Sequence, residues 1–106
     1  MKHVACTVLA AWMFACGPAL AQDQPVAIAT FSILADLTQR VAGDHAQVLT
    51  LVGPNGDAHV FEPGPKESAA LAEADLLIAK GLGFEAWLQR LEDASGFNGK
   101  IVVASD

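Results

Sequence analysis

One histidine lies in a stretch of the chain whose composition prevents regular secondary structure, and this stretch is the first candidate for chemistry. His59 stands within residues 53–68, which read GPNGDAHVFEPGPKES. Glycine and proline pairs on both sides of the histidine are typical of tight turns. Prolines fix φ and restrict the free chain, so such a loop loses less entropy when it orders around a ligand. The sequence therefore predicts a stiff loop that presents an imidazole.

Two interpretations of this histidine stay open from the residues alone. His59 is either a metal ligand or a loop histidine that hydrogen-bonds to the backbone, because a lone histidine does not identify a metal site. Glu62 follows at i+3, a spacing that brings side chains together only on a helix, and Pro63 and Pro65 oppose a helix here. We therefore interpret Glu62 as a loop residue or as one that orients a ligand. His45 has the context of an exposed turn residue.

Other chemistries have little support. One loop histidine, with no cysteine in the predicted mature chain, builds neither a Ser-His-Asp nor a Cys-His arrangement, so we expect no enzyme activity. Residues 81–83, Gly-Leu-Gly, lack the third glycine of a dinucleotide-binding loop and the Lys-Ser/Thr pair of a P-loop. We expect these glycines to form a tight turn between a strand and a helix.

The first 21 residues have the pattern of a secretory signal of bacterial type. Lys2 begins a short basic region, residues 4–14 are almost wholly apolar, and residues 19–21 form the cleavage site Ala-Leu-Ala. The apolar run is shorter than the roughly 20 residues that a membrane-spanning helix needs. We therefore expect residues 1–21 to be cleaved, the mature protein to be periplasmic, and no membrane span to remain.

The predicted mature chain, residues 22–106, is acidic and free of thiols. Cys6 and Cys16 both precede it, so it can form neither a disulfide nor a thiolate metal site. It keeps five basic side chains against all twelve acidic ones, which gives a net charge of −7. Nucleic acid is not expected as a partner, because domains that bind it carry a basic surface.

Strand-like and helix-like segments alternate along the mature chain. The expected strands are residues 26–29, 47–52, 75–79 and 100–104, and the expected helices are residues 32–42, 66–74 and 84–94. Ser32 is the expected cap of the first helix and Gly43 its stop. Two apolar stripes follow helical spacing: Ile33, Leu37 and Val41 in the first helix, and Phe84, Trp87, Leu88 and Leu91 in the last.

This alternation predicts an α/β fold. We expect a single lobe with a mostly parallel four-stranded sheet flanked by helices. About 85 residues bury only some 60–65% of their unfolded surface, so a domain of this size is marginally stable by itself. From size alone, residues 22–106 are either a small complete domain or a fragment of something larger.

Four segments carry a resemblance to a known family. They read ATFSILADL (29–37), LVGPNGDAHVFEPGP (51–65), ADLLI (74–78) and GLGFEAWL (81–88). In order and spacing they resemble the N-terminal part of the periplasmic proteins that bind zinc or manganese for ABC transporters. The D-x-H-x-x-E-P-x-P core of the family falls on Asp57, His59, Glu62, Pro63 and Pro65.

The resemblance implies a site and partners. It assigns His59 as the first ligand of a transported Zn²⁺ or Mn²⁺ ion, and the membrane permease of an ABC transporter as the protein partner. Members of the family have two similar α/β lobes, joined by a long helix, with the metal between them. Their remaining ligands, a histidine, then a histidine or glutamate, then an aspartate, would lie beyond Asp106. The resemblance therefore implies that residues 22–106 are an incomplete N-terminal lobe, one half of such a protein.

The chain departs from the family pattern at two places near the loop. Lys66-Glu67 stands where the family often has Ser-Asp, and Lys80 stands where asparagine commonly precedes the Gly-Leu-Gly turn. Neither change touches the implied ligand. The sequence thus predicts a truncated periplasmic solute-binding protein that captures Zn²⁺ or Mn²⁺ through His59. The alternative is a one-lobe secreted interaction module without metal function, for which a large exposed apolar patch is typical.

Overall fold

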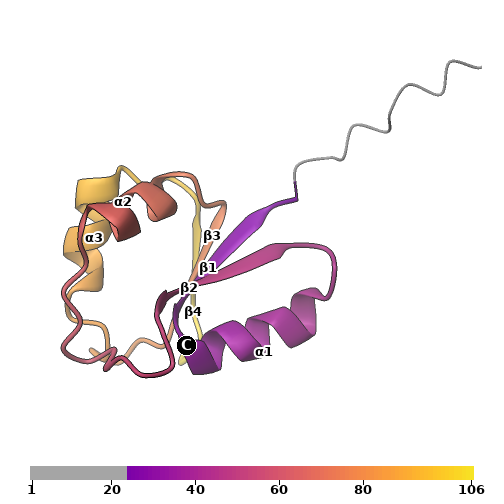
Figure 1. The fold of residues 1–106 in the computed structure, drawn as a ribbon, viewed down its shortest axis with the longest axis horizontal. Helices are drawn as coiled ribbons and strands as arrows, with labels where there is room; N and C mark the ends of the chain where they lie inside the picture. Colours follow the sequence, from indigo (N-terminus) through magenta and orange to yellow (C-terminus); the bar gives the residue numbers. More distant parts are fainter. Residues whose placement is uncertain (1–23) are drawn as a thin grey trace, which may run out of the picture.

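The computed structural model describes residues 24–106, and the predicted signal segment, residues 1–21, lies outside this range. The described chain forms one four-stranded sheet in the order β2-β1-β3-β4 (Figure 1). The strands are β1 (Val26–Phe31), β2 (Gln47–Val52), β3 (Leu76–Ala79) and β4 (Lys100–Val103). Every neighbouring pair is parallel, so the expected α/β sheet is confirmed, and it is parallel throughout.

The centre of the sheet is its most buried part. Ile28 of β1 pairs in register with Leu49 of β2 and with Leu77 of β3. Ile28 and Leu77 are fully buried, whereas Leu49, on an edge strand, is 39% exposed. Thr30, near the carboxyl end of β1, is also fully buried. The apolar run at residues 26–29, predicted as a strand, thus lies in one of the two central strands of the sheet, where both faces are covered.

Three helices cover the two faces of the sheet. Helix α1 (Ser32–Ala42) packs on β1 and β2, and α2 (Pro65–Ala72) packs against α3 (Leu88–Ser95). Figure 1 shows α1 on one side of the sheet and the α2–α3 pair on the other. The main core lies between this pair and the sheet, and includes Leu71, Leu77, Trp87, Leu88 and Leu91.

Helix α1 differs from the expected pattern at one end only. Ser32 is its first helical residue, and the N-cap is Phe31, which is extended and makes no side-chain capping bond. The prediction of Ser32 as the cap is wrong because β1 runs to Phe31 and enters the helix without a loop. At the other end, Gly43 has a φ of +55° and stops the helix as predicted.

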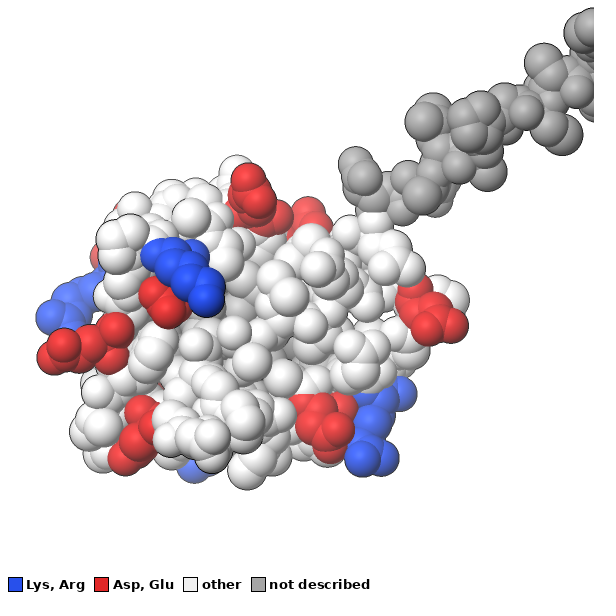
Figure 2. All heavy atoms as spheres, viewed as in Figure 1, with Lys and Arg blue, Asp and Glu red and all other residues white. Residues whose placement is uncertain are grey.

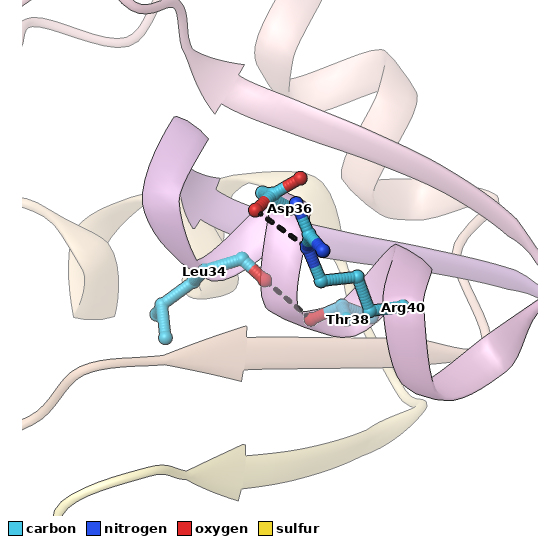
Figure 3. Close-up of polar contacts among 4 residues, drawn as sticks. All are labelled: Leu34, Asp36, Thr38 and Arg40. Atoms are coloured by element: carbon cyan, nitrogen blue, oxygen red, sulfur yellow. Dashed lines mark hydrogen bonds and ion pairs between the residues drawn. The ribbon is translucent and has the colours of Figure 1, made fainter.

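The apolar stripe of α1 faces solvent. Ile33, Leu37 and Val41 are 66%, 54% and 90% exposed, whereas Leu34 is almost fully buried. At about 100° per residue, Ile33 lies about 100° and Leu37 about 60° around the helix from Leu34, so a helix that places Leu34 against the sheet turns these two side chains away from it. Figure 3 shows the polar contacts of this helix: Thr38 Oγ1 donates to the Leu34 carbonyl at 2.6 Å, and Arg40 Nε lies 3.0 Å from Asp36 Oδ2.

The other two helices match their predictions in part. Pro65 is the first residue of α2, where its fixed φ suits a helix start, and Glu67 Oε2 accepts a hydrogen bond from the Gly64 N–H at 2.8 Å. Helix α3 begins at Leu88, so residues 84–87 form turns where a helix was predicted. Trp87, Leu88 and Leu91 are nevertheless buried as the stripe predicted, and Phe84 is half-buried.

The surface has no broad basic region on the face viewed in Figure 2. Acidic and basic side chains are scattered over that face, several basic groups lie beside acidic ones, and uncharged surface separates these places. The whole sequence carries a net charge of −6 at pH 7. Within residues 24–106, no helix combines the length and the apolar character that crossing a bilayer would require.

Candidate functional site

The histidine loop begins with a tight turn directly after β2. The Gly56 N–H donates to the Gly53 carbonyl at 3.0 Å, which closes a turn around Pro54 and Asn55. A Cβ atom at Gly56 would lie 2.7 Å from Val52 Cγ1, so only glycine fits there without a shift. The glycine and proline residues that predicted a tight turn therefore turn the chain immediately beyond the carboxyl end of the sheet.

The peptide unit that precedes His59 is fixed by hydrogen bonds at both its N–H and its carbonyl. The His59 N–H donates to Asp57 Oδ1 at 2.9 Å, in the manner of an Asx turn. The Ala58 carbonyl accepts a bond from the indole N–H of Trp87 at 2.6 Å, and Ala58 itself is buried. The His59 side chain is exposed. The structure thus places the imidazole at the surface of a loop whose backbone is anchored to the core.

Two aromatic contacts hold the loop from the side of α3. The His59 ring centroid lies 6.1 Å from that of Phe84, and the Phe84 ring lies 5.2 Å from that of Phe31. Phe61 meets Trp87 edge-on at 5.1 Å. Lys80 Nζ lies 4.3 Å from the centre of the Phe84 ring. The His59 ring therefore lies beside the Phe84 ring, and the Lys80 ammonium group lies over the same Phe84 ring.

The order of the strands shows why the position of the His59 ring matters for ligand binding. The chain leaves β1 toward β2 through α1, and leaves β3 toward β4 through α3, so adjacent strands connect in opposite directions. The carboxyl ends of β1 and β3 therefore flank the switch point at which open α/β sheets bind their ligands. Phe31 ends β1 and Phe84 follows β3, so the His59 ring lies beside this switch point.

A buried carboxylate lies at the same place. Glu85, which is 8% exposed, accepts hydrogen bonds at Oε2 from Thr30 Oγ1 at 2.6 Å and from the Lys80 N–H at 2.7 Å. Its Oε1 accepts from the Gly81 N–H at 3.0 Å. Sequence reasoning missed Glu85, although an acidic residue between Phe84 and Trp87 interrupts an apolar segment and is a signal that could have found it.

The described chain does not build a complete metal site around His59. Within residues 24–106, no three histidine, cysteine or acidic side chains gather closely enough to hold an ion. Glu62 is exposed and lines, with Trp87 and Arg90, an open cavity of about 690 Å³ that His59 does not line. His45 is exposed in the turn after α1, as predicted.

The hydrogen bonds of His59 bear on the alternative stated above, that it is a loop histidine whose ring hydrogen-bonds to the backbone. Within residues 24–106, the bond at this residue is made by its backbone N–H, and none involves its ring. The arrangement is therefore that of a single exposed imidazole, held in place by its neighbours and free to donate a nitrogen.

Known proteins resemble this chain over most of its described length. A family model, described as ZnuA, zinc-uptake complex component A, periplasmic, matches residues 27–106. The manganese-binding lipoprotein MntA of Halalkalibacterium halodurans is 39% identical over 64 residues, which are 60% of this chain and 21% of that protein.

Two solved structures share the fold. The Mn-bound periplasmic metal binding protein from Candidatus Liberibacter asiaticus superposes with a TM-score of 0.71, at 28% identity, over 78% of this chain and 31% of that one. Zn(II)-bound AdcA from Streptococcus pneumoniae superposes with a TM-score of 0.67, at 29% identity, over 77% and 18% of the two chains. This chain thus spans between about a fifth and a third of the length of these relatives. The match over residues 27–106 shows that the chain belongs to the family of periplasmic component A of zinc-uptake complexes.

Proposed function

We propose that this chain is one lobe of a periplasmic solute-binding protein that captures Zn²⁺ or Mn²⁺, and that His59 supplies the first protein ligand. The observation that carries the proposal is the position of His59. Its imidazole is exposed on an anchored loop beside the switch point of a sheet that belongs to a metal-uptake family. The names of two relatives, which state Mn and Zn(II) as their ions, support the choice of cargo.

One imidazole cannot hold either ion selectively. A tetrahedral zinc site needs three or four protein ligands, and manganese prefers more oxygen donors. In the proposed mechanism His59 donates an unprotonated ring nitrogen, and further donors come from a second lobe that closes over the ion. Asp57 and Trp87 act indirectly, because they fix the backbone that carries His59.

The proposal includes a location and a partner. The relatives are named as lipoproteins or periplasmic proteins, and the predicted signal in residues 1–21 agrees with export of this chain. The loaded protein would deliver its ion to the membrane permease of an ABC transporter. The function proposed is therefore transport and not catalysis.

A second candidate has one observation in its favour. The exposed side chains Ile33, Leu37 and Val41 form an apolar surface along α1, which is typical of a surface that contacts another protein. A one-lobe interaction module would use that surface and would bind no metal. Metal binding at His59 therefore discriminates between the two functions.

Paramagnetic broadening by Mn²⁺ tests the proposal even if the chain binds weakly. Mn²⁺ broadens the NMR signals of nuclei close to it, so substoichiometric Mn²⁺ should broaden the His59 ring protons before those of His45. In a full-length version that carries both lobes, calorimetry with Zn²⁺ should show that His59→Ala lowers the affinity at least about tenfold. His45→Ala is the matched control, because it removes an exposed histidine from a different turn and should leave the affinity unchanged.

Circular dichroism must show that the parent and both variants have the same fold. Equal Zn²⁺ affinity in the parent and the folded His59→Ala variant would reject His59 as the ligand. Equal broadening of His45 and His59 by Mn²⁺ would reject a specific site on this loop.

A further inference from the structure

We propose that Glu85 is a positioning residue for the metal site, because its buried carboxylate holds in place the segment that fixes the His59 loop. This inference rests on the function proposed above. Glu85 lies on the segment after β3 and is not itself placed to bind the ion, since its two oxygens are occupied by groups of the protein.

The carboxylate joins two strands at their carboxyl ends. Thr30 precedes the last residue of β1, and Lys80 follows the last residue of β3, so a single side chain ties both ends together. Hydrogen bonds to a carboxylate are short and strong, and a buried carboxylate is costly without them. The three donors together offset the cost of burying the Glu85 carboxylate.

The turn that Glu85 holds is strained. Gly81, Leu82 and Gly83 have φ values of +86°, +57° and +75°. Leu82 is a non-glycine residue in the left-handed region, where its Cβ atom crowds the following carbonyl oxygen. A Cβ atom at Gly81 would collide with Ser105 and Val103, so the backbone there passes close to the end of β4. A turn of this kind needs an external anchor, and the bonds from Lys80 and Gly81 to Glu85 supply it.

The segment anchored by Glu85 touches the His59 loop at three points. Phe84 meets the His59 ring, and Trp87 both donates to the Ala58 carbonyl and contacts Phe61. Glu85 lies between these two aromatic residues in the chain. Loss of the hydrogen bonds to the Glu85 carboxylate would therefore loosen the contacts that Phe84 and Trp87 make with the His59 loop.

The predicted consequence is a loss of preorganisation at the ligand. If Phe84 moves away, the imidazole samples more orientations, and binding must order it again. Removing a group that orients a metal ligand typically lowers metal affinity by about 10- to 100-fold. We expect the lower end of that range, about tenfold, because Glu85 acts through two other side chains.

The decisive variant is Glu85→Gln, which keeps the size of the side chain but gives it only one acceptor oxygen. In the metal-free chain, the ring current of Phe84 shifts the His59 ring protons, so their NMR signals should move toward those of an unstructured histidine. The Zn²⁺ affinity should fall about tenfold. Thr30→Val removes one of the three bonds with little change in volume, and should change both quantities in the same direction by less.

A matched control separates positioning from general loss of stability. Asp75 Oδ2 accepts a hydrogen bond from the Val26 N–H at 2.8 Å, at the opposite end of the strands. Asp75→Asn weakens a bond of the same type but should leave both the His59 signals and the Zn²⁺ affinity at parent values. A double-mutant cycle with Phe84→Leu should be non-additive, because Glu85 and Phe84 act on His59 through one contact.

Three outcomes overturn the inference. The first is parent-like His59 signals in a folded Glu85→Gln or Thr30→Val variant. The second is an unchanged Zn²⁺ affinity in these variants. The third is full additivity of Glu85→Gln with Phe84→Leu. Failure of the proposed function would look different. The parent chain would then show no effect of metal on His59, while the ring-proton signals of the metal-free variants would still decide whether Glu85 positions the histidine.

Discussion

The indole of Trp87 shows how a single side chain can serve both the core and the candidate site. Its ring lies in the core with Leu88 and Leu91, while its N–H donates to the carbonyl of Ala58, the residue before His59. Tryptophan suits this position because it combines a large apolar ring with one donor. The stability of the lobe and the placement of the histidine are thus coupled at this residue.

We expect Trp87→Phe to destabilise the protein mainly through the lost donor. Phenylalanine fills much of the same space but leaves the buried Ala58 carbonyl without its partner, which costs about 1–3 kcal/mol. Urea denaturation followed by circular dichroism measures this loss. Val60→Ala, at a 70% exposed position of the same loop, should change the stability by no more than about 0.5 kcal/mol. Equal losses in the two variants would contradict this account.

The residues of the site were predictable to different degrees. His59 could be found because turn-forming residues surround it, and the turn at residues 53–56 is present as expected. Its contact with Phe84 could not be found, because the two residues are far apart in the sequence and meet only through the order of the strands. Glu85 was missed because a glutamate in a helical pattern is usually exposed.

At the level of elements, α1 shows that an apolar repeat in the sequence does not predict which side of a helix faces the sheet. Ile33, Leu37 and Val41 follow one another at i+4, yet the helix rests on the sheet through Leu34. A repeat predicts that a helix has an apolar side, but a helix with apolar residues on adjoining sides can be turned either way. The start of α3 was misplaced for another reason, since the Gly-Leu-Gly turn and the bonds to Glu85 keep residues 82–87 out of the helix.

Two neighbouring leucines on α1 provide a direct test of this orientation. Leu34→Ala should cost about 2–5 kcal/mol, as is usual for a buried leucine, because it leaves a cavity against the sheet. Leu37→Ala, at a 54% exposed position, should stay within about 0.5 kcal/mol of the parent. Both substitutions have the same small effect on helix propensity. Chemical denaturation gives the comparison, and a larger loss at Leu37 would mean that the helix is turned the other way.

Helix α3 carries a carboxyl group whose charge opposes folding. Burial, and then the adjacent Asp93 carboxylate, raise the pKa of Glu92 above the ordinary value of a glutamate. An acid with a raised pKa in the folded state binds its proton more tightly there than in the unfolded chain. Its ionised form therefore lowers stability near neutral pH, and this loss disappears as the pH falls through the folded and then the unfolded pKa.

We accordingly expect Glu92→Gln to raise the melting temperature near neutral pH. The gain should vanish below the ordinary glutamate pKa of about 4.3, where both proteins are uncharged at this position. Thermal scans at a series of pH values measure the difference. The exposed Glu73→Gln, near the end of α2, removes the same charge as a control. A gain for Glu92→Gln that is independent of pH would show that titration is not its cause.

At the scale of the whole molecule, the order of the strands creates the site. Alternating strands and helices were enough to predict a parallel α/β sheet, because few other arrangements bury such segments. The order β2-β1-β3-β4 was not predictable from periodicity, since each strand contains a similar apolar run. This order places the ends of β1 and β3 side by side and so brings Phe31, Phe84 and His59 together.

The carboxylate of Glu85 also limits which solutes this lobe can accept. In many proteins with open α/β sheets, the crevice at the switch point receives the phosphate or another negative part of an organic molecule. Here a side chain of the protein already fills that position and uses the donors of Thr30, Lys80 and Gly81. An anionic solute would meet both an occupied crevice and a negative charge. This arrangement agrees with the cargo proposed above, a small cation held at the His59 loop, because such an ion does not need the donors that Glu85 uses.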